Sequence, residues 1–110
     1  SDGTDWTIDT FTTWLSSYDE LRLGMNITDA ATSNFLASLP TPSASYNTKS
    51  IYISATDDNT GDAEEVQLSG SLQDSTGLIS SYYMSDFETV HLRCMQNSNG
   101  DYRWILINKS

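Results

Sequence analysis

The stretch NSNGDYRWILIN, residues 97–108, decides how the C-terminal half of this chain is expected to fold. It contains Asn-Gly, the dipeptide that two-residue β-turns favour because both central positions need a positive φ. The runs on either side, FETVHLRCMQ (87–96) and YRWILIN (102–108), are rich in β-branched and aromatic residues. The pattern predicts an antiparallel hairpin that ends the chain.

A two-residue Asn-Gly turn would also set the register of this hairpin. It would pair Cys94 with Ile105 and Leu92 with Ile107, which predicts one aliphatic face suited to burial. The opposite face would be the candidate ligand or partner face, and its members are Trp104, Tyr102, Met95, Arg93, His91 and Leu106. A bulged turn that also used Ser98 would move the register by one residue and change both faces.

Upstream of the hairpin, the apolar residues alternate with polar ones, which is the period of a half-buried strand. Residues 50–56 place Ile51, Ile53 and Ala55 on one side, and residues 64–73 also alternate. The tetrapeptide DSTG (74–77) is typical of a turn that leads into a further extended run. These segments and the final hairpin predict a curved antiparallel sheet of about four strands.

The first forty residues repeat their apolar positions at steps of three and four, which predicts helices. In residues 5–23 the repeating positions are Ile8, Phe11, Leu15, Tyr18 and Leu21. Thr7 or Asp5 would cap this helix, and Gly24 would end it. A second helix is predicted over Thr28–Leu39, where Pro40 ends it. We therefore expect a single α+β domain, residues 1–110, with N-terminal helices packed on one face of the sheet.

The charge balance limits the possible partners. The chain has 15 acidic residues against five basic ones and a formal charge of −10. Nucleic-acid binding needs clustered Lys and Arg, and anionic lipid needs them too, so neither partner is expected. No segment has the length of a membrane-spanning helix, so membrane insertion is not expected either. The Lys-poor surface, the single cysteine and an N-terminus that resembles the cut edge of a longer protein favour an extracytoplasmic location.

Few residues are candidates for a catalytic or metal-binding role. Cys94 shares its strand parity with aliphatic residues and points away from His91, so we interpret it as a small buried hydrophobe. His91 is the only histidine, and no carboxylate partner is placed beside it by the sequence. In the acidic run 56–65, Asp57, Asn59 and Asp62 have a loosely calcium-like spacing, but a solvated hairpin loop explains the run better. No metal, cofactor or catalytic residue is therefore predicted.

The order of elements resembles the NTF2-like (cystatin-like) α+β superfamily. The resemblance rests on FTTWLSSYDELRL in the first predicted helix and on VHLRCMQNSNGDYRWILIN, which is similar to the terminal strand pair of that superfamily. It implies a cone-shaped sheet under N-terminal helices. For an enzyme, the resemblance implies an Asp or His that acts as acid or base and a Tyr, both near the pocket of the cone. The nearest candidates, His91, Asp86 and Tyr82 or Tyr83, do not align with a catalytic motif.

Three functions follow as hypotheses. The first is a non-catalytic module for protein–protein interaction or assembly, within a cell-envelope transfer or secretion complex, with self-association as one form of contact. The second is a small-ligand binder or isomerase-like protein with an apolar cone cavity. The third is a carbohydrate-binding module that uses its tryptophans and tyrosines.

Overall fold

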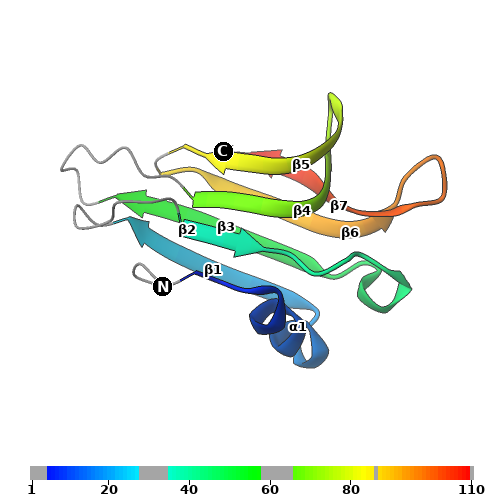
Figure 1. Ribbon diagram of the computed structural model, residues 1–110, viewed down its shortest axis with the longest axis horizontal. Helices are drawn as coiled ribbons and strands as arrows, with labels where there is room; N and C mark the ends of the chain where they lie inside the picture. Colours follow the sequence, from blue (N-terminus) through cyan, green and yellow to red (C-terminus); the bar gives the residue numbers. More distant parts are fainter. Residues whose placement is uncertain (1–4, 28–34, 58–65, 86, 110) are drawn as a thin grey trace.

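The computed structural model describes residues 5–27, 35–57, 66–85 and 87–109. Within these residues the chain forms one α-helix, one short 3₁₀ turn and seven strands (Figure 1). The elements are α1 (Ile8–Ser17), β1 (Glu20–Ile27), β2 (Phe35–Ser38), η1 (Ala44–Tyr46), β3 (Ser50–Asp57), β4 (Val66–Asp74), β5 (Gly77–Met84), β6 (Thr89–Gln96) and β7 (Tyr102–Lys109).

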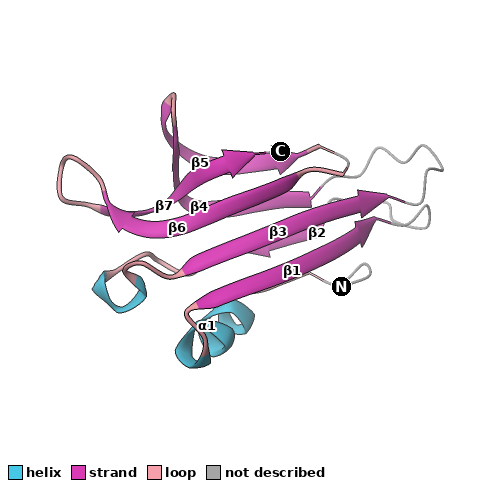
Figure 2. Cartoon of the chain, turned by 180° about the vertical axis from the view of Figure 1, so that it is seen from behind, coloured by secondary structure: helices cyan, strands magenta, loops and turns pink. Residues whose placement is uncertain are grey.

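The seven strands form one mixed sheet that folds back on itself. Its order is β1-β3-β6-β7-β4-β2, and β5 pairs with β4 outside this path. The β1–β3, β2–β4 and β4–β7 pairs are parallel, and the others are antiparallel. Figures 1 and 2 show the result as two layers, with β2, β4 and β5 in front of β1, β3 and β6 in one view and behind them in the other.

Strand β4 connects the two layers because its halves have different neighbours. Its first half pairs with β2, whereas Leu72 and Gln73 pair with β7. The register with β5 shifts between these halves, where Gly70 has a φ of 142°. A Cβ added at Gly70 would lie 3.3 Å from the Leu39 Cβ. Glycine thus allows both the bend and the close approach of the Leu39 segment.

The core lies between the two layers. Its members come from both inner faces, from α1 and from the segments next to α1 and β2, and they form one cluster: Trp6, Phe11, Leu15, Leu21, Met25, Phe35, Ala37, Leu39, Ile51, Ile53, Ala55, Val66, Leu68, Leu72, Met84, Val90, Leu92, Cys94, Trp104 and Leu106. The predicted alternation of β3 is confirmed, because Ile51, Ile53 and Ala55 are all buried.

The predicted fold class is wrong. The chain is predominantly β with a single described α-helix on a seven-stranded mixed sheet, and it is not an α+β NTF2-like cone of helices over four antiparallel strands. The first predicted helix stops at Ser17, and the chain continues as β1. In place of the second predicted helix, Phe35–Ser38 is strand β2, while residues 28–34 lie outside the described residues.

The error has a physical reason, because a spacing of four residues suits both a helix and a strand. Leu21 was assigned to the first helix by its step of three from Tyr18, but Tyr18 is exposed and Leu21 points into the core from β1. Phe35 and Leu39 are also four apart, but Ala37 between them is buried as well, which is a strand period. Position i+4 lies on the same face in either structure, so only the intermediate positions distinguish them.

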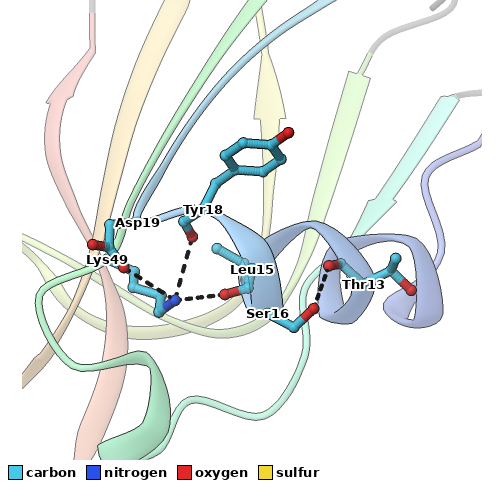
Figure 3. A network of polar contacts seen from close by, with 6 residues as sticks. All are labelled: Thr13, Leu15, Ser16, Tyr18, Asp19 and Lys49. Carbon is cyan, nitrogen blue, oxygen red and sulfur yellow. Dashed lines mark hydrogen bonds and ion pairs between the residues drawn. The ribbon is translucent and has the colours of Figure 1, made fainter.

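Helix α1 confirms the predicted N-cap and part of the predicted buried stripe. Thr7 is its N-cap, and the Thr7 side chain accepts a hydrogen bond from the Thr10 N–H. Phe11 and Leu15 are buried, whereas Ile8 is 52% exposed and does not belong to the buried stripe. At the other end, the Lys49 ammonium donates to the Leu15 and Tyr18 carbonyls and lies 3.2 Å from the Asp19 carboxylate (Figure 3). A cation there satisfies the last carbonyls of the helix.

The β6–β7 hairpin forms as predicted, but its turn is longer by one residue. The Asn97 N–H donates to the Asp101 carbonyl at 2.8 Å, and the Gly100 N–H donates to the Asn97 carbonyl at 2.9 Å. Gly100 has a φ of 86°. This is a three-residue loop, Ser98–Gly100, that ends in a glycine bulge.

The longer turn moves the register by one residue, so the residues of β7 were assigned to the wrong faces. Cys94 pairs with Trp104 instead of Ile105, and Leu92 pairs with Leu106. A bulge between His91 and Leu92 shifts the register back by one residue, so that His91 pairs with Asn108. Because side chains alternate along a strand, a shift of one exchanges the two faces of β7.

Candidate interaction surface

The outer face of β1, β3, β6 and β7 carries the chemically most distinctive side chains of the described chain. We call this surface the arginine face, and its residues are Arg22, Tyr52, His91, Arg93, Met95, Arg103, Ile105 and Ile107. Figure 2 views the molecule from the side on which β1, β3 and β6 are nearest. The inner sides of the same strands belong to the core.

Three side chains of this face form a stack across three strands. Register places Arg22, Tyr52 and His91 directly opposite one another on β1, β3 and β6. The imidazole lies 4.1 Å from the Tyr52 ring centroid with an interplanar angle of 13°, and the Arg22 guanidinium carbon lies 4.1 Å from the same centroid. Since Arg22 and His91 come from opposite sides of β3, they cover both faces of the tyrosine ring.

The surroundings of His91 lower its pKa. Burial lowers the pKa of the imidazole from its ordinary value of 6.5, and Arg93 and Arg22 lower it further, while Glu20 opposes them. The Nε2 atom is buried and has no hydrogen-bond partner among the described residues. A neutral ring is favoured in such surroundings, because a buried cation beside other cations loses solvation and is repelled.

The arginines differ in how firmly they are held. The Arg22 Nε donates to the Glu20 carboxylate at 3.0 Å, in an ion pair whose side chains are both largely exposed. A terminal nitrogen of Arg103 donates to the Leu72 carbonyl at 2.6 Å. Arg93 is exposed, and it has no ion pair within the described part of the chain. Two guanidinium groups are therefore oriented in advance, and the third is open to a partner.

Apolar side chains lie between these charges. Met95 pairs in register with Arg103, and Ile105 pairs with Arg93; both apolar residues are half-buried. Ile107 is the extra residue of the β7 bulge and is 49% exposed. The surface thus combines arginines, one tyrosine, one methionine and two isoleucines. Arg, Tyr and Met are residues that protein interfaces favour.

The structure divides the six predicted residues of the partner face. His91, Arg93 and Met95 lie on the outer face, as expected. Trp104 is fully buried, and its indole N–H donates to the Pro40 carbonyl at 2.9 Å. Leu106 belongs to the core, and Tyr102 packs against it. These three residues lie on the inner face instead of the predicted outer face because the register of β7 differs from the predicted one by one residue.

Sequence reasoning missed five members of the surface, namely Arg22, Tyr52, Arg103, Ile105 and Ile107. Arg22 was placed on a helix, so its strand neighbours could not be identified. Tyr52 had a usable signal, because the alternation of residues 50–56 already placed it opposite the buried isoleucines. Arg103 and both isoleucines follow from the hairpin register alone, and the bulged turn with Ser98 would have placed them here.

The residues considered for chemistry elsewhere have structural roles. Cys94 is buried, as interpreted from its parity, and burial raises the pKa of its thiol. The Tyr82 hydroxyl donates to the Glu88 carboxylate, and burial together with this contact raises the Tyr82 pKa to about 12. Asp86 and the calcium-like positions Asn59 and Asp62 lie outside the described residues. Within the described residues, no group of three His, Cys, Asp or Glu could hold a metal ion.

Two open grooves lie beside Trp6, with volumes of about 400 and 470 Å³. One runs along the start of α1 toward Leu36 and Ser38, and the other lies between α1 and the middle of β1. Both are open to solvent, and neither contains His91 or Cys94. They differ from the closed apolar cavity that the small-ligand hypothesis requires.

Comparisons with known proteins leave the chain without relatives to argue from. No family model, no characterised protein and no solved structure matches it. Among the described residues, no helix has the length and apolar character needed to cross a membrane.

Proposed function

We propose that this protein is a non-catalytic protein–protein interaction module and that the arginine face is its contact surface. The observation that carries the proposal is the concentration of all three arginines of the chain on one sheet face, among Tyr52, Met95, Ile105 and Ile107. Interfaces draw most of their energy from a few such residues around an apolar centre. An exposed sheet face with this composition is a reason to expect a partner.

The arrangement of the aromatic rings gives less support to the carbohydrate hypothesis. A sugar stacks on the open face of a ring, but Arg22 and His91 cover both faces of Tyr52. Trp6 and Trp104 are buried, and Trp14 packs against Trp6 and Phe11 in edge contacts. A protein partner can use the edges of the stack together with the neighbouring isoleucines, and so it fits this surface better.

The proposal is tested by selecting binders from a random peptide display library on the immobilised protein. The variant Ile107→Glu places a charge in the exposed apolar part of the arginine face. Its matched control, Thr12→Glu, makes the same change of charge at an exposed position of α1. We expect selected peptides to bind the wild type and Thr12→Glu equally and to bind Ile107→Glu at least about tenfold more weakly, because burying an unpaired charge is costly.

Peptides that bind Ile107→Glu as well as the wild type would show that the contact lies elsewhere. A selection that enriches no peptide above background would count against a peptide-binding role for the face. Sedimentation equilibrium over a range of concentrations then asks whether the partner is a second copy of this chain. Self-association that Ile107→Glu abolishes would identify it as such.

A further inference from the structure

The charge of the arginine face is opposite to that of the whole protein. The chain has five basic residues and a net charge of −10. Lys49 is engaged at the end of α1, whereas Arg22, Arg93 and Arg103 all lie on the arginine face. Among the described side chains of β1, β3, β6 and β7, Glu20 is the one carboxylate, and it already pairs with Arg22. The face is therefore a local cationic surface on an anionic molecule.

We infer that the arginine face binds acidic, extended polypeptide segments that present carboxylates and apolar side chains on the same face. The inference rests on the proposed function and specifies the chemistry of its partner. Carboxylates match the fork of a guanidinium group, with which they form two parallel hydrogen bonds. Apolar residues on that same face of the segment would lie on Met95 and Ile105, which are half-buried, and on Ile107, which is 49% exposed.

The spacing of the arginines suits an extended segment. Arg22 and Arg93 are two strands apart and offset by two residues, so their Cα atoms are separated by roughly 12 Å on standard sheet geometry. Arg93 and Arg103 are on adjacent strands with the same offset, which gives roughly 8 Å. Two residues of an extended chain advance about 7 Å and four advance about 13 Å. Carboxylates two or four residues apart, which lie on the same face of an extended segment, can therefore meet more than one arginine.

The surrounding charge argues for a short segment and against a long polyanion. The cationic face spans three strand spacings, roughly 14 Å. Beyond it the net charge of −10 repels other anions, and the repulsion decays over about 8 Å at physiological ionic strength. A nucleic acid or a long sulfated polysaccharide would extend past the face into this repulsion. A polypeptide can place two or three carboxylates on the face and continue with neutral residues.

The experiment uses a nine-residue peptide with glutamate at positions 1, 5 and 9, leucine at positions 3 and 7 and serine at the even positions, and a matched peptide with glutamine for every glutamate. Fluorescence anisotropy measures the affinity of each for the wild type, for Arg93→Gln and for Thr12→Glu. The last two variants change the net charge by the same amount, one on the face and one on α1. Thermal unfolding confirms that both variants fold, and Arg22→Gln provides a second variant on the face.

We expect the glutamate peptide to bind the wild type at least about tenfold more tightly than the glutamine peptide, and more weakly as salt is added. Arg93→Gln should weaken it about five- to tenfold, and Thr12→Glu less than about twofold, because only the former removes a contact.

Equal binding of the two peptides would overturn the acidic partner but leave the proposed function standing. No binding of the glutamate peptide by the wild type would overturn the inference, and its failure together with an empty library selection would overturn both proposals. A sulfated oligosaccharide that binds as tightly as the peptide, with the same dependence on Arg93, would overturn the choice of a polypeptide. Self-association lost in Arg93→Gln would replace the peptide by a second copy of this chain.

Discussion

The two faces of the β6–β7 hairpin are built from alternate residues of the same two strands, but they have opposite roles. The inner face holds Leu92, Cys94, Trp104 and Leu106, which are all buried. The outer face holds the charged and half-buried residues of the arginine face. One extra residue in the turn decides which residues of β7 join which face. The comparison shows that a tryptophan next to an arginine in sequence can belong to the core while the arginine lies on the opposite face of the strand.

The largest expected effect is on the inner face. Trp104→Ala should lower the free energy of unfolding by about 3–5 kcal/mol, because it leaves a cavity and removes the indole donor to the Pro40 carbonyl. Ile107→Ala on the outer face should change it by less than about 0.5 kcal/mol. Urea unfolding followed by tryptophan fluorescence or circular dichroism measures both. Similar losses in the two variants would contradict the assignment of the faces.

A smaller effect is expected at the turn that sets the register. Gly100 has a φ of 86°, so Gly100→Ala should destabilise the protein by about 1 kcal/mol through backbone strain. A Cβ at Gly100 would meet no atom within 4 Å, so crowding does not contribute. Chemical denaturation measures the change, and Ser98→Ala in the same loop is the control. If Gly100→Ala did not change the stability, the turn would not require a positive φ at Gly100, which would contradict the three-residue loop and the register that it sets.

His91, on the outer face, should make the free energy of unfolding depend on pH. Its pKa is lower in the folded protein than the ordinary value of 6.5, so the unfolded chain takes up the proton more readily. The contribution of His91 to the free energy of unfolding is therefore present above pH 6.5 and is lost as the pH falls below that value. We expect wild-type stability to fall between pH 7.5 and 5.5 more steeply than that of His91→Gln, as measured by urea unfolding. Parallel pH profiles would contradict a desolvated, neutral His91 in the stack.

The smallest effect on stability is expected at Arg93. Arg93→Ala should change the free energy of unfolding by less than about 0.5 kcal/mol, because the side chain is exposed and has no ion pair within the described residues. Its binding to acidic peptides should nevertheless be impaired. Thermal and chemical unfolding of this variant provide the check. A loss above about 1 kcal/mol would show that Arg93 supports the fold rather than a partner.

The sequence predicted best where local chemistry and periodicity agree. The alternation of residues 50–56 correctly identified a strand and its buried side, and Thr7 was among the predicted caps of α1. Trp104 and Leu106 were misplaced because the turn chemistry admits two loop lengths. The start of β1 was taken for helix because Leu21 follows Tyr18 at a helical step of three, and β2 was taken for helix because Phe35 and Leu39 are four positions apart, a spacing that both structures allow.

The sequence by itself determined the hairpin, the strand alternation, the cap of α1 and the anionic charge of the whole chain. Each of these features depends on residues that are close together in the sequence or on composition, and both can be read from the sequence directly. Only the tertiary structure decided that Arg22, Tyr52 and His91 stack and that three arginines share one face. Those residues come from strands β1, β3, β6 and β7, which the parallel β1–β3 pairing and the hairpin register bring together. Such pairings depend on how the whole core is buried, and no local spacing encodes them.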